Sequence, residues 1–154
     1  MNKIILFLAT LGPIGTKLPA PGTFGSLAGL IALWALLIPG AVEPIVIYST
    51  FGVLAFLAIP ICGIAEKILG KEDPKEVILD EFVAQPLVFL AIPFSKQGME
   101  MLLLLGAGFA LFRLFDILKP LGISRLQSLS GGLGVVADDI AAAGAAGLCL
   151  WFFS

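Results

Sequence analysis

The sequence has no histidine and few charged residues, and both absences restrict the chemistry open to it. Without histidine, phosphatases that use a histidine nucleophile are excluded, and any metal site must be built from other side chains. Only 13% of the 154 residues are charged, whereas ordinary soluble domains carry about 25%. Hydrophobic residues make up 59% of the chain, and the mean hydropathy is +1.08. This composition predicts a protein whose apolar surface faces lipid.

Cysteine and basic clusters are also scarce. Cys62 and Cys149 both lie inside apolar segments, where a thiol behaves as a small hydrophobic group, so we expect no disulfide. A Cys-x5-Arg phosphatase loop is absent, because Ile68 stands six residues after Cys62 and Cys149 is too near the end. No Asp-x-Asp occurs, which argues against an aspartyl phosphoenzyme of the haloacid dehalogenase type. With a net charge of −2 and no basic patch interleaved with aromatics, nucleic acid is not an expected partner.

The long apolar segments predict the fold. Segments of about 18 or more apolar residues can cross a bilayer, and we identify five, at about 25–39, 45–64, 82–94, 101–118 and 133–153. The first and third are short, and Pro60, Pro86 and Pro93 should bend their helices. Residues 1–11 imitate a secretory signal but lack a cleavage pattern, so we interpret them as a short interfacial or re-entrant helix.

We therefore predict an all-α fold, a compact helical membrane bundle of about five long helices plus a short N-terminal helix. Residues 1–154 are expected to form a single domain. A run of small residues at 141–147 should let neighbouring helices approach closely. An all-helical soluble bundle remains the alternative, because Gly and Pro interrupt every segment.

The charges separate strongly if the five segments alternate in direction. One face then receives nine of the eleven acids and seven Lys or Arg against one, counted from Lys17 onward. Excess positive charge marks the cytoplasmic side. The same topology brings five carboxylates to one membrane surface: Asp80, Glu81, Asp116, Asp138 and Asp139.

These carboxylates suggest a metal site. An unpaired carboxylate in hydrocarbon costs several kcal/mol, so it is tolerated mainly beside a partner, water or an ion. Asp80-Glu81 opens one apolar segment, and Asp138-Asp139 lies inside another, after a glycine-rich string at 131–134. Neighbouring residues on a helix diverge by about 100°, so only one of Asp80 and Glu81 is expected to point straight into the site. Mg²⁺ prefers carboxylate, phosphate and water oxygens.

A third block could bind phosphate. Arg113, Asp116 and Lys119 are spaced by three residues and therefore share one helix face. Arginine can grip a phosphate through two parallel hydrogen bonds, and lysine adds a point charge. The alternative is a set of charges that snorkel at a membrane interface, with Arg113 and Asp116 forming a structural ion pair.

A Pro- and Gly-rich turn at 18–26 leads into the first apolar helix. Thr23 or Ser26 could cap that helix, and free N–H groups at a helix start favour a phosphate or carboxylate. An ordinary capped turn would explain the same residues.

These blocks, in this order, resemble the phosphatidylglycerophosphatase A family. The resemblance spans residues 19–144, and its most specific block is the Arg-to-Pro run. One departure is Ala84, where the family tends to place glycine three residues after the Asp-Glu pair. The matching strings are residues 21–26 (PGTFGS), Asp80-Glu81, residues 112–120 (FRLFDILKP), and residues 131–134 (GGLG) with Asp138-Asp139.

The resemblance implies a multi-pass protein of the bacterial inner membrane whose site faces the cytoplasm. It implies a Mg²⁺-dependent phosphatase that converts phosphatidylglycerophosphate, a phospholipid in the bilayer, to phosphatidylglycerol and phosphate. On this basis we predict four metal ligands: Asp80, Glu81, Asp138 and Asp139. Asp116 would be a further ligand or a base, and Arg113 and Lys119 would bind the phosphomonoester with help from Thr23 to Ser26.

Two other classes remain open at this point. A small ion-coupled transporter would also use intramembrane acids, but it requires them near the midplane and accessible from both faces. A structural subunit of a membrane complex would pair its acids with basic residues of a partner. The oligomeric state is not predicted.

Overall fold

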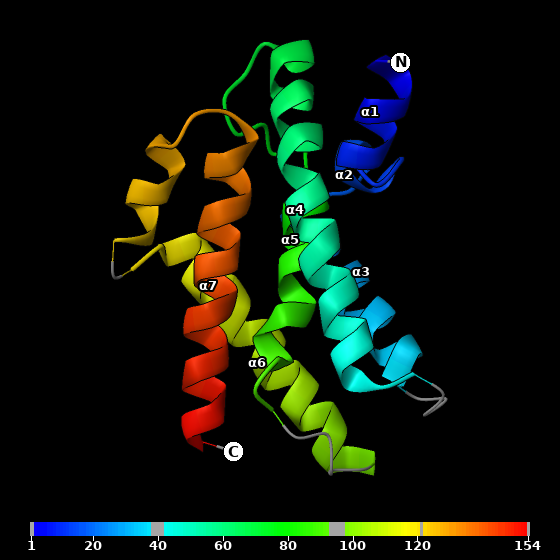
Figure 1. Cartoon of the computed structure of the whole chain (residues 1–154), viewed down its shortest axis with the longest axis vertical. Coiled ribbons are helices and arrows are strands. Elements are labelled where there is room, and N and C mark those ends of the chain that lie inside the picture. The colour runs from blue at the N-terminus through cyan, green and yellow to red at the C-terminus, as the bar shows by residue number, and fades with distance from the viewer. Residues whose placement is uncertain (1, 38–41, 93–97, 121, 154) are drawn as a thin grey trace.

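A computed structural model describes residues 2–37, 42–92, 98–120 and 122–153, and in this part of the chain it is all-α (Figure 1). The prediction of a helical bundle with a short N-terminal helix is confirmed. The α-helices are α1 (Asn2–Ala9), α2 (Ile14–Lys17), α3 (Pro21–Leu37), α4 (Pro44–Leu69), α5 (Leu79–Ala84), α6 (Gly98–Leu118) and α7 (Gly132–Phe153). Two 3-10 helices complete the fold, η1 (Gln85–Phe89) and η2 (Ile123–Ser128).

Among the described residues, three helices are long and apolar enough to cross a membrane, namely α4, α6 and α7, with 26, 21 and 22 residues. Helix α3 is also apolar, but its 17 residues fall short of that length. Large apolar side chains such as Phe56 and Leu103 are well exposed on these helices, and exposed apolar surface of this extent indicates contact with lipid. The protein is therefore a membrane protein.

The long elements alternate in direction, as the apolar segments predicted (Figure 1). The beginnings of α3 and α5 and the end of α6 consequently meet near the second turn of α7. The last turns of α4, together with α1, lie above this level in the view of Figure 1, and η2 lies beside the first turns of α7. This arrangement brings the acidic residues of α5, α6 and α7 into one region.

The segment predicted as a helix over 82–94 forms two short pieces instead, because Pro86 interrupts it. Proline has no N–H to donate to the carbonyl four residues earlier, and its ring clashes with that carbonyl. Here that carbonyl belongs to Phe82. Helix α5 ends two residues later, at Ala84, and η1 begins at Gln85. Helix α4, by contrast, continues through Pro60. The predicted segment ends at Pro39 and at 93–94 lie outside the described residues.

Two glycines allow α3 to approach α5 closely. A Cβ atom on Gly25 would come within 2.9 Å of the Ile78 carbonyl oxygen, and one on Gly29 would collide with the Phe82 carbonyl. The spacing of four residues places both glycines on one face of α3. Only the absence of side chains there lets the backbone of α5 lie against α3.

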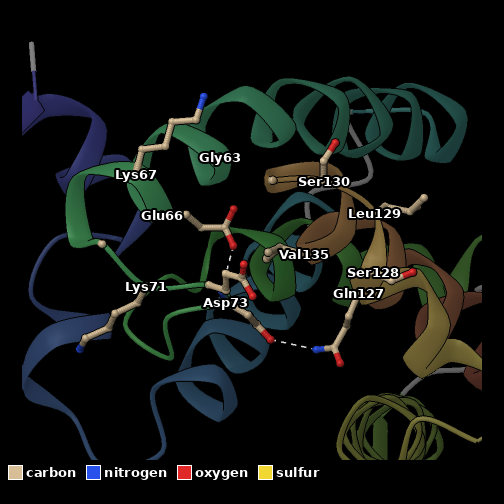
Figure 2. Close-up of a pocket in the computed structure, with 13 residues that line it drawn as sticks. Gly63, Glu66, Lys67, Lys71, Asp73, Gln127, Ser128, Leu129, Ser130 and Val135 are labelled. Carbon is tan, nitrogen blue, oxygen red and sulfur yellow. Dashed lines mark hydrogen bonds between the residues drawn. The ribbon is translucent and has the colours of Figure 1, made fainter.

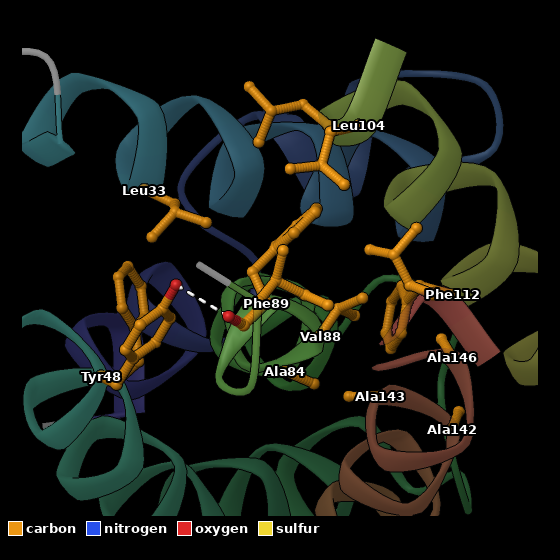
Figure 3. Packing of buried hydrophobic residues seen from close by; sticks show 14 of the residues in the cluster. Leu33, Tyr48, Ala84, Val88, Phe89, Leu104, Phe112, Ala142, Ala143 and Ala146 are labelled. Carbon is orange, nitrogen blue, oxygen red and sulfur yellow. Dashed lines mark hydrogen bonds between the residues drawn. The ribbon is translucent and has the colours of Figure 1, made fainter. Parts of the chain in front are cut away.

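A hydrophobic core lies around η1 (Figure 3). Phe89 and Phe112 are fully buried there, and the Tyr48 hydroxyl donates a hydrogen bond of 3.0 Å to the Phe89 carbonyl. Ala142, Ala143 and Ala146 of α7 are buried against this cluster, which confirms the close packing predicted from the small-residue run. The core holds α5 and η1 between α3, α4 and α7.

The N-terminal helix is tied to the same region. Helix α1 packs against α4, and the backbone N–H of Ile78 donates to the Ala9 carbonyl at 2.9 Å. The bond is two residues before Asp80, so it helps to set where α5 begins.

Candidate functional site

Three carboxylates from α5 and α7 come together inside the bundle. One oxygen from each of Asp80, Glu81 and Asp139 lies within 4.8 Å of the other two. Asp80 and Asp139 are only 5% and 4% exposed. In each of the three residues, one buried carboxylate oxygen has no hydrogen-bond partner among the described residues. Burying charge without compensation is costly, so this acidic group could bind a metal ion.

The two acids on α5 are perturbed by this environment. Burial raises the pKa of Asp80 well above its ordinary value, and the neighbouring charge of Glu81 adds to the effect. Burial, followed by the charge of Asp139, raises the pKa of Glu81 to about 8. A nearby cation favours the charged form of a carboxylate, so a bound metal ion would oppose both shifts.

Arg113 connects the acidic group to α3 and α6. Its Nη1 atom lies 2.6 Å from Asp116 Oδ2 and 3.9 Å from Glu81 Oε1, and it donates a 3.3 Å hydrogen bond to Ser26 Oγ. The Arg113–Asp116 ion pair, which the sequence left open as an alternative to phosphate binding, is therefore present. The Ser26 hydroxyl in turn donates to the Gly22 carbonyl at 2.9 Å, so Ser26 helps to orient the guanidinium group.

Asp116 lies between Arg113 and the three carboxylates. It is 9% exposed, and its charge contributes to the raised pKa of Glu81. That Asp116 shares a functional site with Asp80, Glu81 and Asp139 stays a prediction.

Asp138 faces a different partner. Its Oδ2 atom forms an ion pair with Lys119 Nζ, and its Oδ1 atom accepts the backbone N–H of Asp139 at 3.0 Å. The structure thus groups three of the four predicted metal ligands and holds the fourth against the ammonium group of Lys119.

The backbone of Lys119 is strained. This residue has a φ of 44° and precedes Pro120, and such a conformation costs free energy.

The predicted helix cap at Thr23 or Ser26 is wrong. Helix α3 begins at Pro21, so both residues lie inside it. The backbone N–H groups of Thr23 and Phe24 donate to the Ala20 carbonyl at 3.0 and 3.4 Å, so they are not free to bind an anion. Proline suits the first helical position because its missing N–H would be unpaired there anyway, and this explains the earlier start.

Gly22 is a site residue that the sequence did not indicate. A Cβ atom at this position would collide with Glu81 Oε1 and lie 3.3 Å from Arg113 Nη2. Glycine therefore makes room for the carboxylate and the guanidinium group at the start of α3. The signals in the sequence were a Pro-Gly pair, which is common in turns, and its place in the string at 21–26 that resembles the family.

Gln85 was also missed. It is completely buried, four residues after Glu81, and neither polar atom of its side-chain amide has a partner among the described residues. A glutamine beside a proline in an apolar run carries no sequence signal for this environment.

A pocket of about 490 Å³ lies between the end of α4 and residues 127–131 (Figure 2). On its wall, the Asp73 N–H donates to Glu66 Oε1 at 2.8 Å, and Gln127 Nε2 donates to Asp73 Oδ2 at 2.9 Å. Val135 also lines the pocket, one helical turn before Asp139. The pocket therefore lies next to the buried acidic group.

Together these features define a helical membrane protein with a buried acidic site, which could bind a metal ion and is flanked by an arginine and a lysine. Comparison of the sequence with known families makes the assignment specific. The family model of phosphatidylglycerophosphatase A matches residues 7–154, and the chain belongs to that family. The resemblance identified from the sequence is confirmed, and with it the assignment as a phosphatase.

Individual relatives agree with this assignment. Phosphatidylglycerophosphatase A of Haemophilus influenzae is 38% identical over 145 residues, covering 93% of this chain and 83% of the relative. The Escherichia coli protein of the same name is 32% identical over 124 residues, covering 79% and 67%. A provisionally named phosphatidylinositol-3-phosphatase of Bacteroides thetaiotaomicron is 34% identical over 125 residues, covering 80% and 76%. No solved structure gives a significant match to the chain.

Proposed function

We propose that this protein hydrolyses the phosphomonoester of phosphatidylglycerophosphate within the bilayer, releasing phosphatidylglycerol and inorganic phosphate. The observation that carries the proposal is the buried group of Asp80, Glu81 and Asp139 beside Arg113. Carboxylate oxygens without a hydrogen-bond partner among the described residues, next to a guanidinium group, provide for both a cation and a phosphate. Membership of the family and the names of two relatives support the same substrate.

The metal ion we propose is Mg²⁺, held by Asp80, Glu81 and Asp139. Oxygen ligands of this kind suit a hard divalent cation. Such an ion would neutralise part of the phosphate charge and lower the pKa of a bound water molecule. Asp138 remains a candidate fourth ligand, but its pairing with Lys119 favours a role in orienting that lysine. Magnesium would then share the site with substrate oxygens and water.

Arg113 and Lys119 would hold the phosphomonoester. Arginine can contact two phosphate oxygens at once, and lysine adds a charge from the other side. Ser26 would act by orienting Arg113, to which its oxygen is hydrogen-bonded, whereas the half-buried Thr23 side chain remains a candidate contact for the headgroup. Asp116, whose Oδ2 already accepts from Arg113, is our candidate for the carboxylate that orients or deprotonates the attacking water.

We further propose a bacterial inner-membrane location with the site on the cytoplasmic face. The support is the excess of Lys and Arg at the end of the bundle that carries the site, which is typical of cytoplasmic loops. A lipid substrate could remain in the bilayer while its headgroup enters the site.

The test is phosphate release from phosphatidylglycerophosphate by the purified protein in detergent, with Mg²⁺ and with a chelator. We expect turnover that stops when the metal is removed and returns when Mg²⁺ is added. Phosphatidylinositol 3-phosphate, measured in parallel, tests the substrate assignment, because one relative carries that name. Lack of turnover on phosphatidylglycerophosphate would contradict the proposal and favour a transporter or a structural subunit.

A further inference from the structure

An apolar groove runs along the surface between α6, η2 and α7. Its volume is about 460 Å³. Every residue that lines it is apolar: Phe115, Ile123, Ala141, Gly144, Ala145 and Leu148. Leu148 is 70% exposed, and α6 and α7 are both long enough to span a membrane, so the groove faces the surrounding lipid.

One end of the groove lies near the polar site. Ala141 and Ala145 follow Asp138 by three and seven residues, which places them on the same face of α7. The backbone N–H of Lys119 donates to the Phe115 carbonyl at 2.8 Å, so Lys119 lies one turn beyond Phe115, directly after α6 ends at Leu118. Lys119 pairs with Asp138, and this ion pair therefore lies beyond one end of the groove.

The dimensions suit a hydrocarbon chain. The lining of the groove along α7 runs from Ala141 to Leu148, a rise of about 10 Å at 1.5 Å per residue. Midway along this length stands Gly144, where a Cβ atom would meet no described atom within 4 Å. The middle of the groove is therefore open because this position has no side chain.

We propose that the groove holds one acyl chain of the phospholipid substrate, with the headgroup beside Lys119. This inference rests on the function proposed above and adds the means by which the enzyme recognises a lipid. A ligand with a hydrocarbon chain and an anionic head matches both the apolar lining and the lysine at its end. A soluble phosphomonoester would use the polar end alone.

Gly144→Leu tests the proposal, because the new side chain would occupy the open groove. Leucine favours a helix more than glycine does, so the variant should fold. Gly106→Leu is the matched control. Gly106 is also an exposed helical glycine with open space around it, and it lies nine residues before Phe115, about 180° away around α6.

The measurement compares kcat/KM for two substrates in the same detergent, long-chain phosphatidylglycerophosphate and its deacylated headgroup. In Gly144→Leu we expect the ratio of long-chain to deacylated kcat/KM to fall about tenfold, equivalent to about 1.4 kcal/mol. In Gly106→Leu we expect the wild-type ratio. An unchanged ratio in Gly144→Leu, or an equal fall in both variants, would overturn the groove assignment.

A second measurement does not depend on turnover. A phosphatidylglycerol analogue with a photoreactive diazirine on one acyl chain should label residues 141–148 more than residues 45–54 on the outward face of α4. Gly144→Leu should abolish that preference, and equal labelling of both segments in the wild type would contradict the proposal. If the wild type releases no phosphate yet shows the preference, the proposed function fails while the acyl-chain groove stands.

Discussion

Lys119 and Asp138 form an ion pair that joins the end of α6 to the second turn of α7. Asp138 is 2% exposed at its side chain and Lys119 is 20% exposed. Burial lowers the pKa of Lys119, but the hydrogen bond and the charge of Asp138 outweigh that effect, so the pKa lies above its ordinary value. Because Asp138 also accepts the N–H of Asp139, one residue links the lysine to the three buried carboxylates.

Removal of Lys119 should therefore leave a buried charge unpaired. We expect Lys119→Met to destabilise the protein by about 3 kcal/mol, since breaking a buried ion pair from one side is strongly unfavourable. The double variant Lys119→Met/Asp138→Asn should recover part of this loss. Unfolding of the wild type, the single variants Lys119→Met and Asp138→Asn, and the double variant in detergent measures the coupling, and strictly additive effects would show that the pair contributes nothing.

Asp139→Asn should remove one ligand of the proposed metal site. We expect phosphate release to fall more than about 100-fold, because changes that only surround a metal ligand already cost 10–100-fold. Membrane insertion should be retained. Glu43→Gln is the matched control, because Glu43 is exposed at the start of α4 and its side chain makes no capping hydrogen bond. Full activity of Asp139→Asn would remove this residue from the site.

Arg113→Lys should show that a positive charge alone is insufficient to bind the phosphate. Lysine keeps the positive charge but cannot contact Asp116, Glu81 and Ser26 with the planar fork of arginine. We expect kcat/KM to fall about 10- to 100-fold, in line with the loss of about 1.5–3 kcal/mol for a hydrogen bond to a charged group. Ser26→Ala, which removes only the group that orients Arg113, should cause a smaller loss. Wild-type kinetics in Arg113→Lys would contradict a phosphate-binding role.

Gly22→Ala should displace the Glu81 carboxylate, with which the new methyl group would collide. We expect the Mg²⁺ concentration for half-maximal activity to rise about tenfold or more, as for other residues that support metal ligands. Gly52→Ala on α4, where a Cβ atom meets no described atom within 4 Å, serves as the control. An equal Mg²⁺ concentration for half-maximal activity in both variants would show that the site tolerates a methyl group at position 22.

Gln85→Met tests the buried amide below Glu81. A polar group left without a partner costs about 1–3 kcal/mol, and methionine has a similar shape without that cost. We expect the variant to be more stable by about 1 kcal/mol, as judged from thermal unfolding in detergent. A lower melting temperature would mean that the amide is satisfied in the folded protein.

The sequence by itself determined the helical architecture and the alternation of the long elements. These features follow from local properties, because the length of an apolar run decides whether it can span a bilayer and its neighbours decide where it ends. The break after Ala84 also has a local cause in Pro86, although the apolar composition of 82–94 concealed it.

Only the tertiary structure decided which acids lie together in the buried group. Asp138 and Asp139 are adjacent, but they diverge by about 100° around α7, so one meets Lys119 and the other meets Asp80 and Glu81. The rotation of α7 against its neighbours makes that choice, and it depends on packing over the whole bundle. The same holds for Gly22, whose importance comes from a carboxylate nearly sixty residues away in the chain.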